Sequence, residues 1–286
     1  MFWMDYIFQN NVCFQLVGSL HCEFFVSDGR LELKISDYYY LKKMPKEAWA
    51  WEFTRRNSAY VNAWKKQKNH SLKQKEITIL EMKTACKFGL LAFNNPNVNS
   101  KNIDVFWSPN STPNILKCSL IDHSHSECKE GLILADLDLR LTYVQSEDQK
   151  SHLLLQDETS SLQLVFDVSL DLDTFFDFEI HLPAIYNRSK QIKSAIKLDQ
   201  LLSCKKFKNI QGLSDSKSNH YIEVLFAMDL SSIGYSQRDI AKIIFGEHAI
   251  LYGWEGVSDS TKSKVKRLFS SGRSLIKAGH KTFFGV

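Results

Sequence analysis

The sequence lacks the motifs by which many enzymes and metal proteins are recognised. Its 286 residues contain no glycine-rich P-loop, no G-x-S-x-G, no H-E-x-x-H and no H-x-E with a cysteine pair. Six cysteines and nine histidines are scattered without a C-x-x-C pair, so metal-ligand spacing is missing as well. The tightest group of possible ligands is His123, His125 and Cys128. We favour free cysteine thiols in a reducing cytoplasm over a metal site at this group. We expect a protein that is not an enzyme and uses no cofactor.

Long apolar runs are also absent. No segment approaches the roughly 20 uninterrupted apolar residues that a membrane-spanning helix needs. The first residues carry Asp5, lack a basic region, and place polar residues 9–11 before their apolar stretch, which is not typical of a signal peptide. We expect a cytoplasmic protein with no membrane partner.

Charge is present but unevenly distributed. Between Lys42 and Lys75 ten Lys or Arg face two acids, between Asp122 and Lys190 fourteen acids face five bases, and from Leu201 onward thirteen bases face seven acids. Two basic ends around an acidic middle indicate that a polyanion binds the ends, because opposite charges attract over about a Debye length.

A capped helix followed by a long basic helix is predicted near the C-terminus. Ser236 with Asp239 has the spacing of a capping box, and Gly246 is placed to end that helix. Ser258 offers a second N-cap, and apolar residues from Val265 to Ile276 recur on one side of a helix of about five turns. Lys or Arg residues occupy its other sides. A short capped helix before a long basic one is typical of helix-turn-helix domains, although many charged helix faces are merely solvated.

The middle of the chain predicts a β domain of six to eight antiparallel strands. Residues 162, 164 and 166 are apolar and alternate with Gln163, Val165 and Asp167, the pattern of a half-buried strand. Short runs rich in β-formers recur between turn clusters. They are Phe88–Phe93, Ile103–Trp107, Ile115–Ile121, Leu132–Asp136, Leu139–Val144, His152–Gln156, Leu162–Val168 and Thr174–His181.

These patterns predict an α+β protein with a short N-terminal helical module, an antiparallel β middle domain and a C-terminal all-α helix-turn-helix-like domain. The expected divisions follow the changes in composition. They are 1–35, an N-terminal extension with a hairpin signal at Asp28-Gly29; 36–82, an aromatic and basic helical module; 83–187, the β domain; 188–213, a linker helix; and 214–286, the helix-turn-helix-like domain.

The N-terminal module is rich in both aromatic and basic residues. Trp49, Trp51, Phe53, Tyr60 and Trp64 fall within one predicted helix pair. Such aromatics stack on unpaired bases in some proteins, but a small hydrophobic core or a subunit contact is the favoured interpretation. The basic residues are secondary candidates for a DNA or subunit contact, with a salt bridge to the acidic middle as the alternative for the two arginines. Together with one tryptophan, these candidates are Arg55, Arg56, Trp64, Lys65 and Lys66.

Two stretches resemble a known bacterial family. In the first, residues 236–246 and 254–279, the similarity rests on Ser236-Gln237-Arg238, Ile240-Ala241, Phe245-Gly246, Trp254, Ser258, Lys264-Val265-Lys266-Arg267, Gly272, Leu275 and Gly279. This pattern resembles the C-terminal domain of RovC-type transcriptional regulators, and residues 38–64 resemble the N-terminal module of the same family. The sequence departs from the family in having lysines where arginines are commoner and His280 in place of a tyrosine, which leaves the base preference open. The resemblance implies a bacterial DNA-binding regulator that activates type VI secretion genes or mobile-element genes. It also implies a homo-oligomer, with a hexamer as one form.

The predicted partner is promoter double-stranded DNA. Gln237 suits adenine, Arg238 suits guanine or phosphate, and the start of the long helix suits phosphate. The sequence leaves open which of the two helices enters the major groove. Two alternatives also stay open: the protein could be a protein-interaction module or a nonspecific nucleic-acid accessory protein of a mobile element. The predicted DNA-binding residues are Ser236, Gln237, Arg238, Lys242, Ser258, Ser260, Thr261, Lys262, Lys264, Lys266, Arg267, Arg273 and Lys277.

Overall fold

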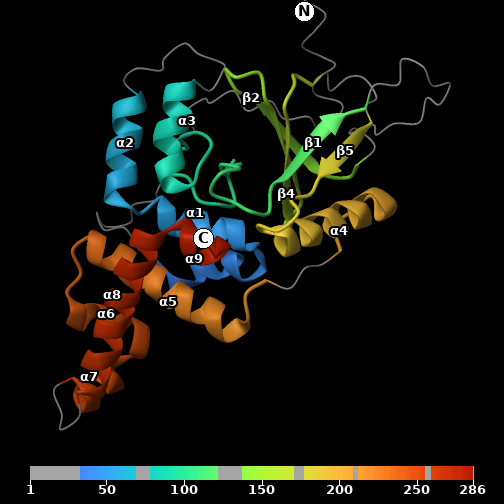
Figure 1. The fold of residues 1–286 in the computed structure, drawn as a ribbon. Coiled ribbons are helices and arrows are strands. Elements are labelled where there is room, and N and C mark those ends of the chain that lie inside the picture. Colours follow the sequence, from blue (N-terminus) through green and yellow to red (C-terminus); the bar gives the residue numbers. More distant parts are fainter. Residues whose placement is uncertain are drawn as a thin grey trace, which may run out of the picture.

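The computed structural model describes residues 33–68, 78–121, 137–170, 177–208, 212–254 and 259–285. Within these segments helices precede and follow a five-stranded sheet, so the predicted α+β class is confirmed. Figure 1 shows the sheet at the upper right, α1 and α9 near the middle, and α6, α7 and α8 as an arm at the lower left. The predicted hairpin turn at Asp28-Gly29 lies outside the described residues.

The elements follow one another as helices, then strands, then helices. The N-terminal helices are η1 (Ile35–Lys43), α1 (Lys46–Thr54), α2 (Ser58–Lys68), α3 (Ile79–Ala85) and η2 (Cys86–Phe88). The strands are β1 (Leu116–Leu120), β2 (Arg140–Gln145), β3 (Ser151–Gln156), β4 (Ser161–Phe166) and β5 (Phe178–His181). The later helices are α4 (Arg188–Cys204), α5 (Asp215–Ser232), α6 (Gln237–Phe245), α7 (Glu247–Gly253), α8 (Ser260–Ala278) and α9 (His280–Phe284).

The sheet is mixed, which corrects the purely antiparallel prediction. Its order is β2-β3-β4-β1-β5, and β1 runs parallel to β4 while the other neighbours are antiparallel. The predicted strands at 88–93 and 103–107 meet only in an isolated bridge between Leu90 and Trp107. The run at 132–136 lies outside the described residues. The described residues therefore contain five strands of this sheet, one fewer than the lower end of the predicted range.

Both faces of the central strands are covered. Leu153, Leu155 and Leu164 pack on one face with Leu198 and Leu201 of α4. The opposite face of β4 was expected to be solvated. There, Gln163 is buried and its side-chain amide exchanges hydrogen bonds of 2.9 Å with the backbone N–H and C=O of Trp107. The predicted alternation of β4 is confirmed, but residues 88–115 pack over its second face. A polar residue in the strand pattern therefore does not show that its face is exposed to solvent.

Helix α1 is buried between two hydrophobic clusters. The rings of Trp49 and Phe53, one helical turn apart, lie 5.7 and 5.6 Å from the ring of Tyr221 in α5. On another side, Trp51 packs edge-to-face against Tyr60 at 5.6 Å. These four aromatics are fully buried, so the prediction of a hydrophobic core is confirmed for them. Every residue of α1 from Ala48 to Thr54 is buried, which is consistent with this central position.

The N-terminal helices and the C-terminal helices share one core. Residues from η1 and α1, including Tyr38 and Leu41, pack with Leu225 of α5, Ile240 of α6 and Val265 of α8. Segments more than 150 residues apart in the chain therefore stabilise each other by burying common apolar surface. The position of α8 is determined by the N-terminal module as well as by its own neighbours.

Candidate nucleic-acid interface

Helix α6 is capped as the sequence predicts. The Asp239 N–H donates to Ser236 Oγ at 3.2 Å and the Ser236 N–H donates to the Asp239 carboxylate at 3.3 Å, which forms the capping box. Gly246 ends the helix with φ of 85°, a backbone conformation that glycine adopts at little cost. Gln237 and Arg238, in the first turn, are exposed.

The cations of α6 have acidic neighbours. Lys242 forms an ion pair with Glu247 at the start of α7. The hydrogen bond from Lys242, together with its charge, lowers the pKa of Glu247, and Arg238 adds to this effect. The pKa of Asp239 is lowered first by its hydrogen bond with Ser236, with further contributions from Arg238 and Lys242. The positive charge on α6 is therefore partly compensated at short range.

Helix α8 has a different charge pattern. Its 19 residues include six Lys or Arg and no Asp or Glu. Val265, Leu268 and Phe269 are buried against α5 and α6, as the apolar periodicity predicts. Lys262, Lys266, Arg273 and Lys277 follow at intervals of four, seven and four residues, which places them along one stripe of the helix. We call these four residues the basic stripe; its last three members are exposed and Lys262 is partly exposed.

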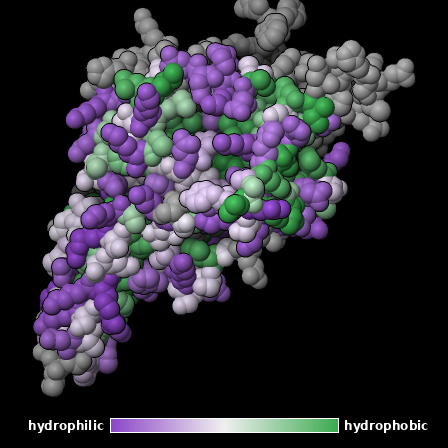
Figure 2. All heavy atoms as spheres, viewed as in Figure 1, coloured by the Kyte–Doolittle hydropathy of each residue, from purple (hydrophilic) through white to green (hydrophobic). Residues whose placement is uncertain are grey.

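Two further cations of α8 lie off the stripe. Arg267 is exposed, and its Nε donates to the Ser263 carbonyl at 3.3 Å. Lys264 is exposed, and its Nζ lies 5.6 Å from the centre of the Phe245 ring of α6. Figure 2 shows the arm formed by α6, α7 and α8 as mostly hydrophilic. The helix thus presents cations around most of its solvent side.

A glycine allows α8 to approach α5 closely. A Cβ at Gly272 would lie 2.7 Å from Met228 and 3.3 Å from Val224, both on α5. The two helices can therefore pack with their backbones near each other, which fixes the orientation of α8 and of the residues it exposes.

The start of α8 corrects one predicted DNA contact. Thr261 is buried, and its hydroxyl donates to the Ala249 carbonyl of α7 at 3.0 Å. A Cβ at Gly253 would collide with the Thr261 side chain, so the two helices meet closely at this point. Thr261 joins α7 to α8 and its hydroxyl is not directed to a phosphate. Ser260 is exposed, Lys262 pairs with Asp259 at 3.0 Å, and Ser258 lies outside the described residues.

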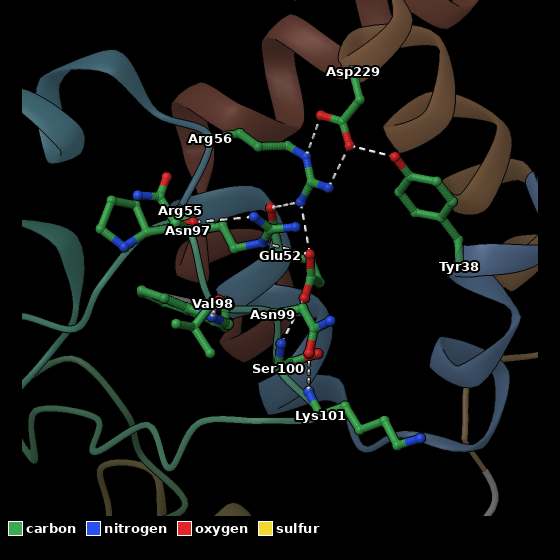
Figure 3. Close-up of polar contacts among 12 residues, drawn as sticks. Tyr38, Glu52, Arg55, Arg56, Asn97, Val98, Asn99, Ser100, Lys101 and Asp229 are labelled. Carbon is green, nitrogen blue, oxygen red and sulfur yellow. Dashed lines mark hydrogen bonds and ion pairs between the residues drawn. The ribbon is translucent and has the colours of Figure 1, made fainter. Parts of the chain in front are cut away.

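The two arginines of the N-terminal module form a buried ionic network, not a surface contact. Arg56 donates two parallel hydrogen bonds to the Asp229 carboxylate of α5, from Nε at 2.8 Å and from Nη2 at 2.6 Å. Its Nη1 donates to the Glu52 carboxylate at 2.7 Å. Arg55 donates to the same Glu52 carboxylate at 2.7 Å. Tyr38 reaches Asp229 from η1 at 2.5 Å. Figure 3 shows Arg56 between the two carboxylates. The proposed contacts of Arg55 and Arg56 with DNA or with the acidic middle are therefore wrong.

Electrostatics stabilise the charged forms of this network. Burial alone would raise the pKa of Glu52, but the charges of Arg55 and Arg56 and hydrogen bonds from Arg56 and the Ser100 N–H lower it to about 2. Burial likewise opposes ionisation of Asp229, and Arg56 and Tyr38 outweigh it, so its pKa is lowered. The network joins η1, α1, α5 and the loop at 96–101.

Sequence reasoning missed this network, although a local signal exists for half of it. The spacing of Glu52 three and four residues before Arg55 and Arg56 is visible in the sequence as a helical ion-pair pattern. Asp229 is 173 residues away from Arg56, and no local signal connects them. On the neighbouring helix α2, Trp64 is partly buried and Lys65 and Lys66 are exposed.

In the part of the chain that the structure describes, no group of three or more His, Cys, Asp or Glu residues is arranged to hold a metal. His123, His125 and Cys128 lie outside that part. Likewise, none of the described helices is long and apolar enough to cross a membrane.

Comparison with known families identifies the C-terminal region. Residues 181–284, which include α4 to α9, match the model of the RovC DNA-binding domain, described as the DNA-binding domain of a type VI secretion system (T6SS) transcription factor. The resemblance to RovC-type regulators is thereby confirmed for this region. The match does not extend to residues 38–64. No curated protein matches the chain significantly.

Proposed function

From this DNA-binding domain we propose that the protein is a sequence-specific transcription regulator that binds promoter DNA mainly through α8. The coarser function, a DNA-binding transcription regulator, follows from the family match. We further propose that it activates secretion-system or mobile-element genes as a homo-oligomer. The T6SS description of the matched family supports the choice of target genes. A transcription-factor domain also favours a role without catalysis.

The charge pattern of α8 is the main observation that supports DNA binding through this helix. Its solvent side carries six cations and the helix contains no acid, whereas the cations of α6 lie beside Asp239 and Glu247. Phosphate contacts supply a large share of the affinity of DNA-binding proteins through counterion release, so the helix that contains no acid is the better docking element. We therefore assign the main electrostatic contact to α8. Lys65 and Lys66 of α2 stay secondary candidates for a DNA or subunit contact.

The function is tested by fluorescence anisotropy of the purified chain with promoter DNA and with a scrambled duplex over a salt series. Tight binding with a steep negative salt slope, and a preference for the promoter of about a thousandfold or more, supports the specific regulator. A steep slope without preference would instead indicate a nonspecific nucleic-acid accessory protein. Failure to bind any duplex at low salt would favour the protein-interaction module.

Gln237 and Arg238 are proposed to read bases from the N-terminus of α6. Both are exposed in the first turn, and bidentate contacts of Gln with adenine and of Arg with guanine are common. We expect Gln237→Ala or Arg238→Ala to weaken binding to the promoter by about 1–3 kcal/mol and to weaken random DNA much less. Paired titrations on the two duplexes measure the difference. An equal loss on both duplexes would show that these residues contact only the backbone.

An apolar segment next to the sheet edge supports the proposed homo-oligomer. Strand β5 ends the strand order of the sheet, and Leu182, Ile185 and Tyr186 follow it with 44, 90 and 78% of their surface exposed. Exposed apolar residues beside an edge strand are a common place for subunits to meet. We expect Ile185→Asp with Tyr186→Asp to lower the mass measured by light scattering while leaving far-UV circular dichroism unchanged. An unchanged mass above that of a monomer would place the interface elsewhere.

A further inference from the structure

A cavity lies where the N-terminal module, the sheet and the C-terminal helices meet. Its volume is about 670 Å³, within the range of cavities that hold small organic ligands. Residues near the start of α1 form one wall, β3, β4 and the turn between them form another, α4 forms a third, and residues 282–285 around the end of α9 form the fourth. The site is distinct from the exposed side of α8, because none of the six α8 cations lines it.

One wall is a cationic face of α4. Lys190, Lys193, Ser194 and Lys197 line the cavity, and their spacing of three, four and seven residues from Lys190 places them on one side of the helix. The apolar residues Leu198 and Leu201 pack instead on the sheet. Helix α4 therefore directs a polar, positively charged side toward the cavity.

The three lysines are held in different ways. Lys190 Nζ donates to the carbonyls of Phe284 and Gly285 at 2.8 and 3.1 Å, and Lys197 Nζ donates to the Ser161 carbonyl at 2.8 Å. An ammonium group has three N–H donors, so these bonds position the charges without using all donors. Lys193 is exposed at the cavity rim. Burial lowers the pKa of Lys197, with partial opposition from Glu47 and Asp157.

The charges around the cavity do not balance. Its lining includes five Lys or Arg and two carboxylates: Lys46, Arg140, Lys190, Lys193 and Lys197 against Glu47 and Asp157. Arg140 is paired with Asp104 at 2.7 Å, which leaves four lysines against two acids. A partly enclosed site with excess positive charge favours an anion, because the protein screens such charges less than water does.

Three buried polar atoms of the lining residues also lack a hydrogen bond within the described residues. Ser160 Oγ, Thr112 Oγ1 and Trp107 Nε1 have no hydrogen-bond partner among the described residues, and the three residues are only 1, 3 and 2% exposed. Leaving such buried groups unpaired is unfavourable, and native proteins rarely do so. Two hydroxyls and an indole N–H can all donate hydrogen bonds, and the oxygens of an anion accept them.

We propose that this cavity binds a small organic anion that carries phosphate or carboxylate groups. The α4 lysines neutralise the anion, Ser160, Thr112 and Trp107 donate hydrogen bonds to its oxygens, and apolar residues such as Ile103 and Phe283 cover the rest of it. Because α9 follows α8 after Gly279 alone, a ligand here contacts the element next to the proposed DNA-binding helix.

The proposal is tested by thermal unfolding of the full chain with three probes, namely inorganic phosphate, citrate and adenosine monophosphate, with adenosine as the neutral control. At a saturating concentration we expect at least one anion to raise Tm by roughly 4 °C or more, and adenosine to leave it unchanged. Phosphate or adenosine monophosphate as the active probe identifies a phosphorylated ligand, and citrate identifies a carboxylated one. Absence of a shift with all three anions overturns the proposal.

Matched variants separate the cavity from a general salt effect. Lys193→Glu and Ser160→Ala should each weaken the active probe about tenfold or more, whereas Lys206→Glu, an exposed lysine beyond α4, should not. Equal shifts in the wild type and in Lys193→Glu would indicate nonspecific stabilisation and contradict the site. A double variant, Lys266→Glu with Arg267→Glu, should keep the full response, since these residues lie outside the cavity. Loss of the response in that variant would place the anion on α8.

Discussion

Replacing Lys266 and Arg267 with glutamate is expected to abolish tight DNA binding without unfolding the protein. Both side chains are exposed on α8, between the buried residues Val265 and Leu268, so the substitutions leave the core unchanged. Each removed charge-assisted phosphate contact costs about 1.5–3 kcal/mol, so the pair should weaken binding on the order of 100-fold or more. Anisotropy titrations measure the affinity, and the salt slope should fall by roughly one for each lost phosphate contact.

The matched control reverses two charges elsewhere. Lys205 and Lys206, exposed just after α4, can be changed to glutamate with the same change in net charge. If binding responds only to the overall charge, both double variants should lose affinity equally. If α8 contacts the duplex, the Lys205→Glu, Lys206→Glu protein should bind nearly as tightly as the wild type. Unchanged affinity of the α8 variant would refute the assignment of this helix.

Removing the charge of Arg56 is expected to lower the free energy of unfolding more than any other substitution proposed here. Arg56→Met would leave Asp229 and Glu52 without their main cationic partner in a site where Arg56 has 9% and Glu52 none of its side-chain surface exposed. Breaking a buried pair in this way costs about 3–5 kcal/mol, which corresponds to a fall in Tm of about 6–15 °C for a protein of this size. Calorimetry or thermal circular dichroism measures the change. Arg238→Met, on the exposed side of α6, is the control and should change Tm little.

The same network predicts how stability depends on pH. The folded protein lowers the pKa of Glu52 to about 2 and also lowers that of Asp229. Carboxyls with depressed pKa values stabilise the fold above their ordinary pKa of about 4, and this contribution is lost as the pH falls toward the folded value. The wild type should therefore lose stability between about pH 5 and pH 2. The Tm difference from Arg56→Met should narrow over that range, and a constant difference would contradict the role of the two carboxylates.

The local elements of the C-terminal region were predictable because their signals are local. Ser236, Asp239 and Gly246 determine where α6 starts and ends, and the periodicity of Val265 and Leu268 determines the buried side of α8. Capping and amphipathic spacing act within a few residues of each other, so they can be read without a structure. Thr261 looked like a helix-start phosphate contact by the same logic. Its burial depends on α7, which packs against it through Gly253.

The sheet shows where local reasoning ends. Alternation along β4 predicts its two faces, but the cover over Gln163 comes from residues 88–115, and nothing local to either strand indicates that β1 pairs in parallel with β4. Pairing partners and second layers are chosen by contacts between distant segments. A strand pattern alone does not specify them.

By itself, the sequence determined the α+β class, the capped helix α6, the long helix α8 with its basic character and the resemblance of the C-terminal region to RovC-type regulators. Only the tertiary structure decided which residues the N-terminal aromatics pack against and where the two arginines find their partners. Trp49 and Phe53 pack against α5 in the hydrophobic core, and Arg56 forms a buried ion pair with Asp229. The physical reason is that helix caps and periodicity are short-range properties of the chain. Whether an arginine meets a phosphate, water or a carboxylate 173 residues away depends on which surfaces the packed helices bury.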